Sequence, residues 1–72
     1  MIVKCFNMAY GNLPGNLQSK AREEIMKACN WSTFAYFYMK KNGTRGLTDI
    51  EENNVAIIFK RYGIDAFTGE KL

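Results

Sequence analysis

The sequence of 72 residues has no histidine, two cysteines and one proline. Cys5 and Cys29 have no cysteine near them in the sequence, so the chain offers no ligand set for a zinc site. No apolar run approaches the ~18 residues that a membrane-spanning helix needs, and no membrane contact is expected. The first residues also lack the pattern of a signal peptide. Both cysteines are therefore expected to be free thiols in the reducing cytoplasm.

Residues suited to catalysis are scarce as well. Ser19 and Ser32 have no candidate base, and the paired carboxylates at 23–24 and 51–52 have neither histidine nor a nucleophile near them. The stretch YGNLPGN at 10–16 lacks the lysine and the spacing of a phosphate-binding loop. A chain this short does not shape a deep cleft. We expect no enzyme, no cofactor and no small-molecule substrate, and instead a binding module.

Apolar residues make up 47% of the chain, which is enough for one small folded core. The net charge of +3 permits binding to a polyanion without requiring it. The basic charge is concentrated at Lys40, Lys41 and Arg45, in a segment without acidic residues. Acidic residues follow directly, between Thr48 and Glu52. The basic segment begins where an aromatic-rich stretch ends.

Residues 1–16 are expected to form an extended arm that ends in a turn. Ile2, Lys4 and Phe6 alternate with their neighbours, which is a weak strand signal. Glycine, asparagine and the only proline then interrupt regular structure in YGNLPGN. Such an arm could pair with the arm of another chain or simply cover the core. The remaining residues, 17–72, are assigned to one helical domain.

Three helices are predicted within that domain, which makes the fold all-α. The first spans about 17–28 with Asn16 as its N-cap, and its apolar stripe is Leu17, Ala21, Ile25 and Ala28. The second follows Ser32 as N-cap and ends at Asn42–Gly43. The third begins with the capping box Thr48-Asp49-Ile50-Glu51 and ends at Gly63–Ile64 with the pattern of a Schellman motif. Its apolar stripe is Val55, Ile58, Phe59 and Tyr62.

The first two predicted helices are joined by only three residues, 29–31, so they should meet at a steep angle. Two helices joined by a tight turn form a helix-turn-helix, in which the second helix enters the DNA major groove. The segment IMKACNWS at 25–32 resembles the turn region of Cro/C1-type repressors. Asn30 stands where those proteins have glycine, and asparagine accepts a left-handed backbone.

The segment FYMKKNGTRGLTDIE at 37–51 is similar to small Cro-like proteins of Bacteroidetes bacteria and their mobile elements. The matching positions are Phe37, Tyr38, Lys41, Gly43, Leu47 and Glu51. The resemblance covers about 17–64. It implies a small helix-turn-helix domain of three to four helices that binds double-stranded DNA and regulates transcription. The stretch from Trp31 to Gly43 is about one residue longer than the repressor pattern.

The aromatic helix has two sides of different character. Trp31, Phe34 and Phe37 are predicted to face the core together with Lys41, which leaves Tyr36, Tyr38 and Met39 on the opposite side. That side could contact DNA, a protein partner or a second copy of the chain. In the DNA hypothesis, Ser32, Thr33, Tyr36 and Lys40 face the groove, while Lys41, Asn42, Thr44 and Arg45 hold the backbone.

A homodimer is expected in that case, because two half-sites restore the affinity that one small domain lacks. The alternative function is a protein–protein interaction module that uses the exposed aromatic side of the second helix.

Overall fold

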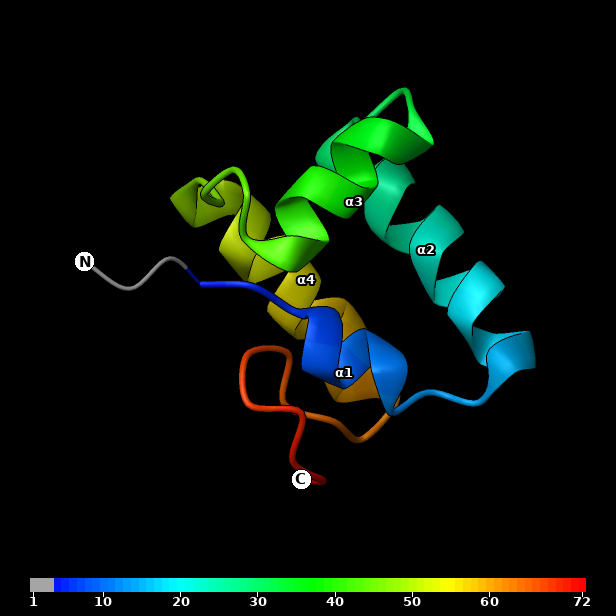
Figure 1. Cartoon of the computed structure of the whole chain (residues 1–72). Coiled ribbons are helices and arrows are strands. Elements are labelled where there is room, and N and C mark those ends of the chain that lie inside the picture. The colour runs from blue at the N-terminus through cyan, green and yellow to red at the C-terminus, as the bar shows by residue number, and fades with distance from the viewer. Residues whose placement is uncertain (1–3) are drawn as a thin grey trace.

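Four helices form the part of the chain that the computed structural model describes, residues 4–72 (Figure 1). They are α1 (Asn7–Gly11), α2 (Gly15–Cys29), α3 (Phe34–Asn42) and α4 (Asp49–Arg61). After α4 the chain turns back, and Ile64 pairs with Lys71 in a single antiparallel bridge. No strand occurs within residues 4–72. The fold is therefore a small all-α domain, as the sequence predicts.

The N-terminal segment differs from the prediction. Residues 7–11 form a helix, whereas an extended arm was expected there; Ile2 and Val3 of the predicted strand lie outside the described residues. The buried side chains Phe6, Ala9, Tyr10 and Leu13 recur with helical spacing. Their shared burial, which the alternation at 2–7 did not indicate, turns the segment into a short helix that belongs to the core.

α2 and α4 pack against each other, and α3 crosses near the C-terminal end of α2 (Figure 1). Ala21 and Ile25 of α2 and Val55 and Phe59 of α4 are buried, as their predicted stripes require. Ala28 of the predicted α2 stripe is exposed instead. α2 also begins two residues earlier than expected, after Pro14, and Asn16 lies inside the helix rather than capping it.

Both ends of α4 follow the prediction closely. Thr48 Oγ1 accepts a hydrogen bond from the Glu51 N–H, and the Glu51 carboxylate accepts one from the Thr48 N–H, which completes the capping box. At the other end, Gly63 has a φ of 75°. The N–H groups of Gly63 and Ile64 donate to the carbonyls of Lys60 and Phe59, as in a Schellman motif.

An aromatic cluster centred on Phe6 joins the elements. The Phe6 ring lies 5.7 Å from Phe37 of α3 and 5.9 Å from Phe59 of α4, measured between ring centroids. The Trp31 ring stacks on Phe6 at 6.4 Å. Phe6, Phe37 and Phe59 are completely buried. This cluster fixes α3 on top of α4 and so determines which side of α3 faces outward.

Candidate nucleic-acid interface

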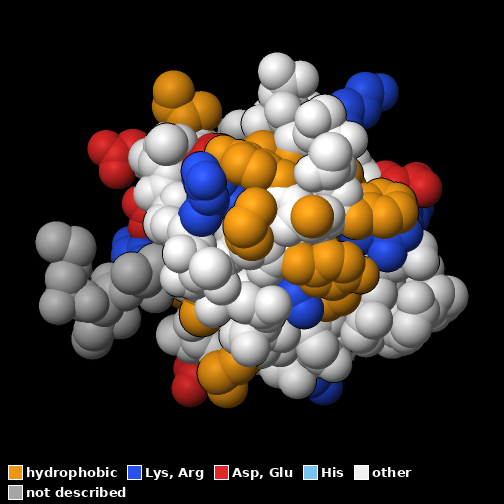
Figure 2. Space-filling model, turned by 45° about the horizontal axis from the view of Figure 1, so that its top comes forward, with side chains coloured by type: hydrophobic (Ala, Val, Ile, Leu, Met, Phe, Trp, Pro, Cys, Tyr) orange, Lys and Arg blue, Asp and Glu red, His pale blue; other side chains and the backbone are white. Residues whose placement is uncertain are grey.

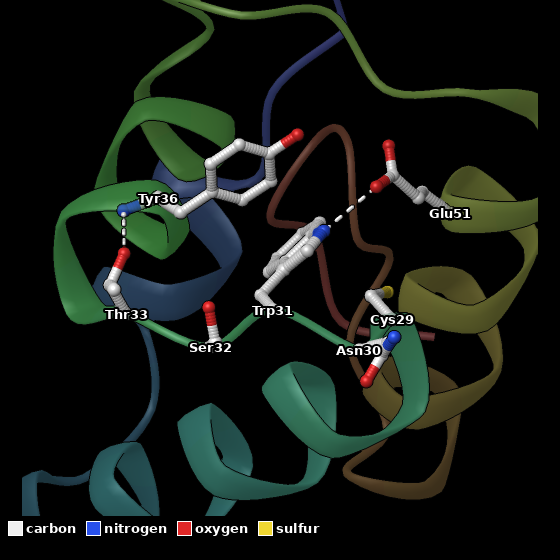
Figure 3. A pocket seen from close by; sticks show the side chains of 7 residues that line it. All are labelled: Cys29, Asn30, Trp31, Ser32, Thr33, Tyr36 and Glu51. Atoms are coloured by element: carbon white, nitrogen blue, oxygen red, sulfur yellow. Dashed lines mark hydrogen bonds between the residues drawn. The ribbon is translucent and has the colours of Figure 1, made fainter.

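The connection between α2 and α3 is a tight turn of residues 30–33. Asn30 adopts the left-handed conformation, with φ 59° and ψ 41°. It occupies the position at which the repressors that the sequence resembles have glycine. The Trp31 N–H donates to the Met26 carbonyl at 2.8 Å, so the turn closes the end of α2. Thr33 rather than the predicted Ser32 caps α3, since its Oγ1 accepts from the Tyr36 N–H at 3.2 Å (Figure 3).

Lys40 was predicted to face the DNA groove, but in the structure its side chain is buried. Only 5% of the residue is exposed, and its Nζ donates to Glu51 Oε1 and to the Gly46 carbonyl, both at 2.8 Å. Its ammonium also lies 5.4 Å from the centre of the Tyr36 ring. A buried cation requires such partners. Lys40 therefore ties α3 to the start of α4 and is removed from the candidate DNA contacts.

Glu51 joins three parts of the chain. Besides Lys40 and the Thr48 N–H, it accepts a hydrogen bond from Trp31 Nε1 at 2.7 Å, which Figure 3 shows. Burial alone would raise the pKa of this carboxyl, but the hydrogen bonds from Lys40, Thr48 and Trp31 outweigh burial and lower it. Glu51 is thus held in its charged form, and its charge is balanced internally by Lys40.

The outward side of α3 is rotated relative to the prediction. Phe37 and Trp31 are buried as expected, but Phe34, predicted to face the core, is 56% exposed. Tyr36, predicted to face the groove, is half-buried with its ring 6.0 Å from Trp31. Tyr38 is exposed. Two contacts accompany this orientation: Phe37 packs against Phe6 in the core, and Lys40, on the same side of α3 as Tyr36, bonds Glu51.

The other predicted groove and backbone residues lie around this outward side. Ser32 and Thr33 are exposed at the N-terminal end of α3. Asn42, Thr44 and Arg45 are exposed at the other end, where Gly43 stops the helix with a φ of 83°. Lys41, predicted on the core side, is half-buried beside them. Seven of the eight predicted DNA contacts therefore surround α3, although Tyr36 is only partly accessible.

Cations on this face lie over aromatic rings. Lys41 Nζ is 5.1 Å from the ring centre of Tyr38 and 5.2 Å from that of Tyr10. The Arg45 guanidinium lies 5.8 Å from the Tyr36 ring. Figure 2 shows hydrophobic side chains grouped on this side of the molecule, with lysine and arginine side chains between them. Each cation is thus held at the surface by attraction to a ring rather than by a carboxylate.

Arg22 of α2 belongs to the same face and was not identified from the sequence. Its guanidinium lies 4.5 Å from the ring centre of Phe34, at the N-terminal end of α3. Arg22 Nε is buried and has no hydrogen-bond partner. Nothing in the sequence places Arg22 beside Phe34, because the two residues are twelve positions apart and Phe34 was assigned to the core.

A hollow of about 270 Å³ lies beside the turn (Figure 3). Its lining residues are Cys29, Asn30, Trp31, Ser32, Thr33, Tyr36 and Glu51. Burial, together with the nearby Glu51 carboxylate, raises the pKa of the Cys29 thiol to about 11. A thiol of that pKa is protonated at neutral pH and is a poor nucleophile. The hollow is also smaller than the ~300–1,000 Å³ of ordinary ligand pockets.

Within residues 4–72, no group of three or more histidine, cysteine, aspartate or glutamate side chains is placed to hold a metal ion. The helices of this part of the chain also include none with the length and apolar character needed to cross a membrane.

Comparison of the chain with models of protein families, with curated proteins and with solved structures gave no match.

Proposed function

We propose that the chain binds double-stranded DNA through α3 and the turn that precedes it, and that it acts as a small transcriptional regulator. Two helices joined by a four-residue turn, with the second helix lying on the surface, are the arrangement that places a helix in the major groove. Ser32 and Thr33 lie at the N-terminal end of α3, which is the end that contacts base edges in this mode of binding.

One observation carries the proposal: the segment that forms this face contains no carboxylate. The sequence has no aspartate or glutamate between Glu24 and Asp49, while the same stretch contains Lys27, Lys41 and Arg45 besides the buried Lys40. Glu51, the carboxylate hydrogen-bonded to Lys40, faces inward and is neutralised there. A surface with cations and without anions attracts the phosphate backbone and gains affinity by releasing counterions.

The rotation of α3 changes the residues assigned to the groove. Ser32, Thr33, Tyr38 and Asn42 are exposed along it and take that role. The Thr33 hydroxyl accepts the N-cap hydrogen bond, so it is still able to donate its proton to a base edge or phosphate. Lys41 and Arg45, with Arg22 on the opposite flank, are assigned to phosphates, where contacts fix position without reading sequence.

The test is fluorescence anisotropy of a labelled duplex of about 20 base pairs, titrated with protein over a range of salt concentrations. Replacing Lys41 and Arg45 together with alanine should weaken binding about ten-fold or more and reduce the salt slope by about two. Lys40 is left unchanged, because its removal would disturb the fold.

The matched control replaces Lys20 and Lys71, which are exposed on α2 and near the C-terminus. Both double variants have a net charge of +1, that is +3 minus 2. The control should bind nearly as the wild-type chain does. Equal weakening in the two variants would mean that net charge alone drives binding, and no rise in anisotropy of the duplex at any salt concentration would refute the proposal.

A second candidate function is favoured by one specific observation. Phe34 and Tyr38 are 56% and 41% exposed on the same helix, and exposed aromatic rings are common at protein–protein contacts. In that case α3 meets a partner protein rather than DNA. The salt titration separates the two functions, because an aromatic protein contact does not produce salt-sensitive binding to a random duplex.

A further inference from the structure

The outward side of α4 carries two large apolar residues without a partner in the described chain. Ile50 is 74% exposed and Ile57 is 48% exposed. They are seven residues apart, which is two helical turns, so both lie on one side of the helix. Val55 and Phe59 are buried on the other side. The α4 stripe, defined as Asp49, Ile50, Asn53, Ile57, Lys60 and Arg61, therefore points away from the core.

The charges on the α4 stripe are separated along its length. Asp49 is exposed at the N-terminal end, while Lys60 and Arg61 are exposed at the C-terminal end. Within residues 4–72 none of these three side chains forms an ion pair; the two pairs present are Lys4–Glu52 and Lys40–Glu51. One end of the stripe is thus negative, the other positive, and an apolar section lies between them.

We infer that the α4 stripe binds the α4 stripe of a second copy, with the two helices antiparallel. This orientation places Asp49 of each copy against Lys60 and Arg61 of the other, and Ile50 against Ile57. The arrangement is symmetric about a two-fold axis, so one surface complements itself. A parallel orientation would instead bring like charges together at both ends.

The centre of the stripe fits the same arrangement. Asn53 is exposed midway between the two isoleucines, so the two-fold axis brings the Asn53 side chains of both copies together. A side-chain amide both donates and accepts, and two of them pair across such an axis. In the antiparallel orientation the positive end of each helix dipole also lies beside the negative end of the other, which is favourable.

The inference supplies an interface for the homodimer that the sequence analysis expects, but it does not depend on DNA binding, since it is measured without DNA. α4 has 13 residues and is about 20 Å long, so the paired stripes form a small interface. Small interfaces of this kind are weak. We expect a dissociation constant in the micromolar range and measure oligomeric state at about 5–500 µM protein.

The experiment is sedimentation equilibrium of two charge-reversed variants, alone and mixed. The first variant is Asp49→Lys, and the second is Lys60→Glu with Arg61→Glu. Each alone should dimerise about ten-fold or more weakly than the wild-type chain, because like charges face each other at both ends. An equimolar mixture should recover the dimer, because both ends of a heterodimer then pair opposite charges.

Far-UV circular dichroism establishes that each variant is folded at the working temperature. Asn53→Cys provides an independent measurement: it should form a disulfide-linked dimer on mild oxidation, whereas Lys20→Cys on α2 and the wild-type chain should not. A monomeric wild-type chain at all concentrations, or variants that dimerise equally well alone and mixed, would overturn the inference. Dimerisation without DNA binding would leave it standing while the proposed function fails.

Discussion

At the scale of single residues, the Glu51 carboxylate joins three separate parts of the structure. It accepts hydrogen bonds from the turn, from α3 and from the start of its own helix. Lys40 is buried because of it. Removing one partner of such a pair leaves a buried charge without compensation, and this is more costly than losing a surface pair.

This pair predicts how stability depends on pH. The pKa of Glu51 is lower in the folded chain than its ordinary value of 4.5. The contribution of Glu51 to the free energy of unfolding is therefore fully present above about pH 4.5, and it is lost as the pH falls through the folded-state pKa. Asp65, whose pKa is lowered by hydrogen bonds from the Phe67 and Thr68 N–H groups, contributes in the same direction.

Glu51→Gln should lower the free energy of unfolding at pH 7 by about 3 kcal/mol. It should also flatten the acid limb of the stability curve, which urea unfolding followed by far-UV circular dichroism measures between pH 7 and pH 3. The control is Glu52→Gln, whose carboxylate pairs with the exposed Lys4 at 3.0 Å; it should cost only about 0.5 kcal/mol. An equal loss of unfolding free energy in the two variants would show that the hydrogen bonds of Glu51 do not stabilise the fold.

At the scale of helices and turns, three local signals predicted helix ends correctly, while the N-caps predicted at Asn16 and Ser32 were wrong. The Thr48 capping box, the stop at Gly43 and the end at Gly63–Ile64 each depend on a few neighbouring residues, and the structure confirms them. The orientation of α3 could not be predicted in this way. It involves Phe37 packing against Phe6 and Lys40 reaching Glu51, eleven residues away, and the periodicity within α3 shows neither of these partners.

The same limit explains the errors in the candidate site. Exposure of Ser32, Thr33, Asn42, Thr44 and Arg45 follows from their places at the two ends of α3, which the sequence indicates. The positions of Lys40 and Arg22 depend on tertiary partners, namely Glu51 and Phe34. Sequence patterns show which residues share a helix face but not which distant side chain draws that face inward.

The turn between α2 and α3 yields a prediction at this scale. Asn30 has a left-handed backbone, which costs a residue with an ordinary side chain about 1 kcal/mol. Asn30→Ala should therefore lower the free energy of unfolding by about 1 kcal/mol, whereas Asn30→Gly should leave it nearly unchanged or raise it. Thermal and urea unfolding of the two variants measure the difference. A more stable alanine variant would contradict the turn geometry.

At the scale of the whole molecule, the N-terminal segment completes the core. Phe6 packs against the turn, α3 and α4 at once, and its N–H donates to the Lys41 carbonyl at the end of α3 at 3.1 Å. An extended arm was predicted from the alternation at 2–7 and the turn residues of YGNLPGN, whereas the structure has a helix, α1, of only five residues there. A helix so short depends on tertiary packing rather than on its own propensity.

The last prediction follows from this packing. Phe6→Ala leaves a cavity among aromatic rings and should lower the free energy of unfolding by about 3–5 kcal/mol, a large part of the stability of a domain this small. Met8→Ala, two residues later on the surface and 63% exposed in the wild-type chain, should cost about 0.5 kcal/mol or less. If the N-terminal segment were an arm outside the core, both substitutions would lower the free energy of unfolding by the same small amount. Since α3 rests on Phe6, the proposed DNA binding should also be lost in the Phe6 variant and kept in the Met8 variant.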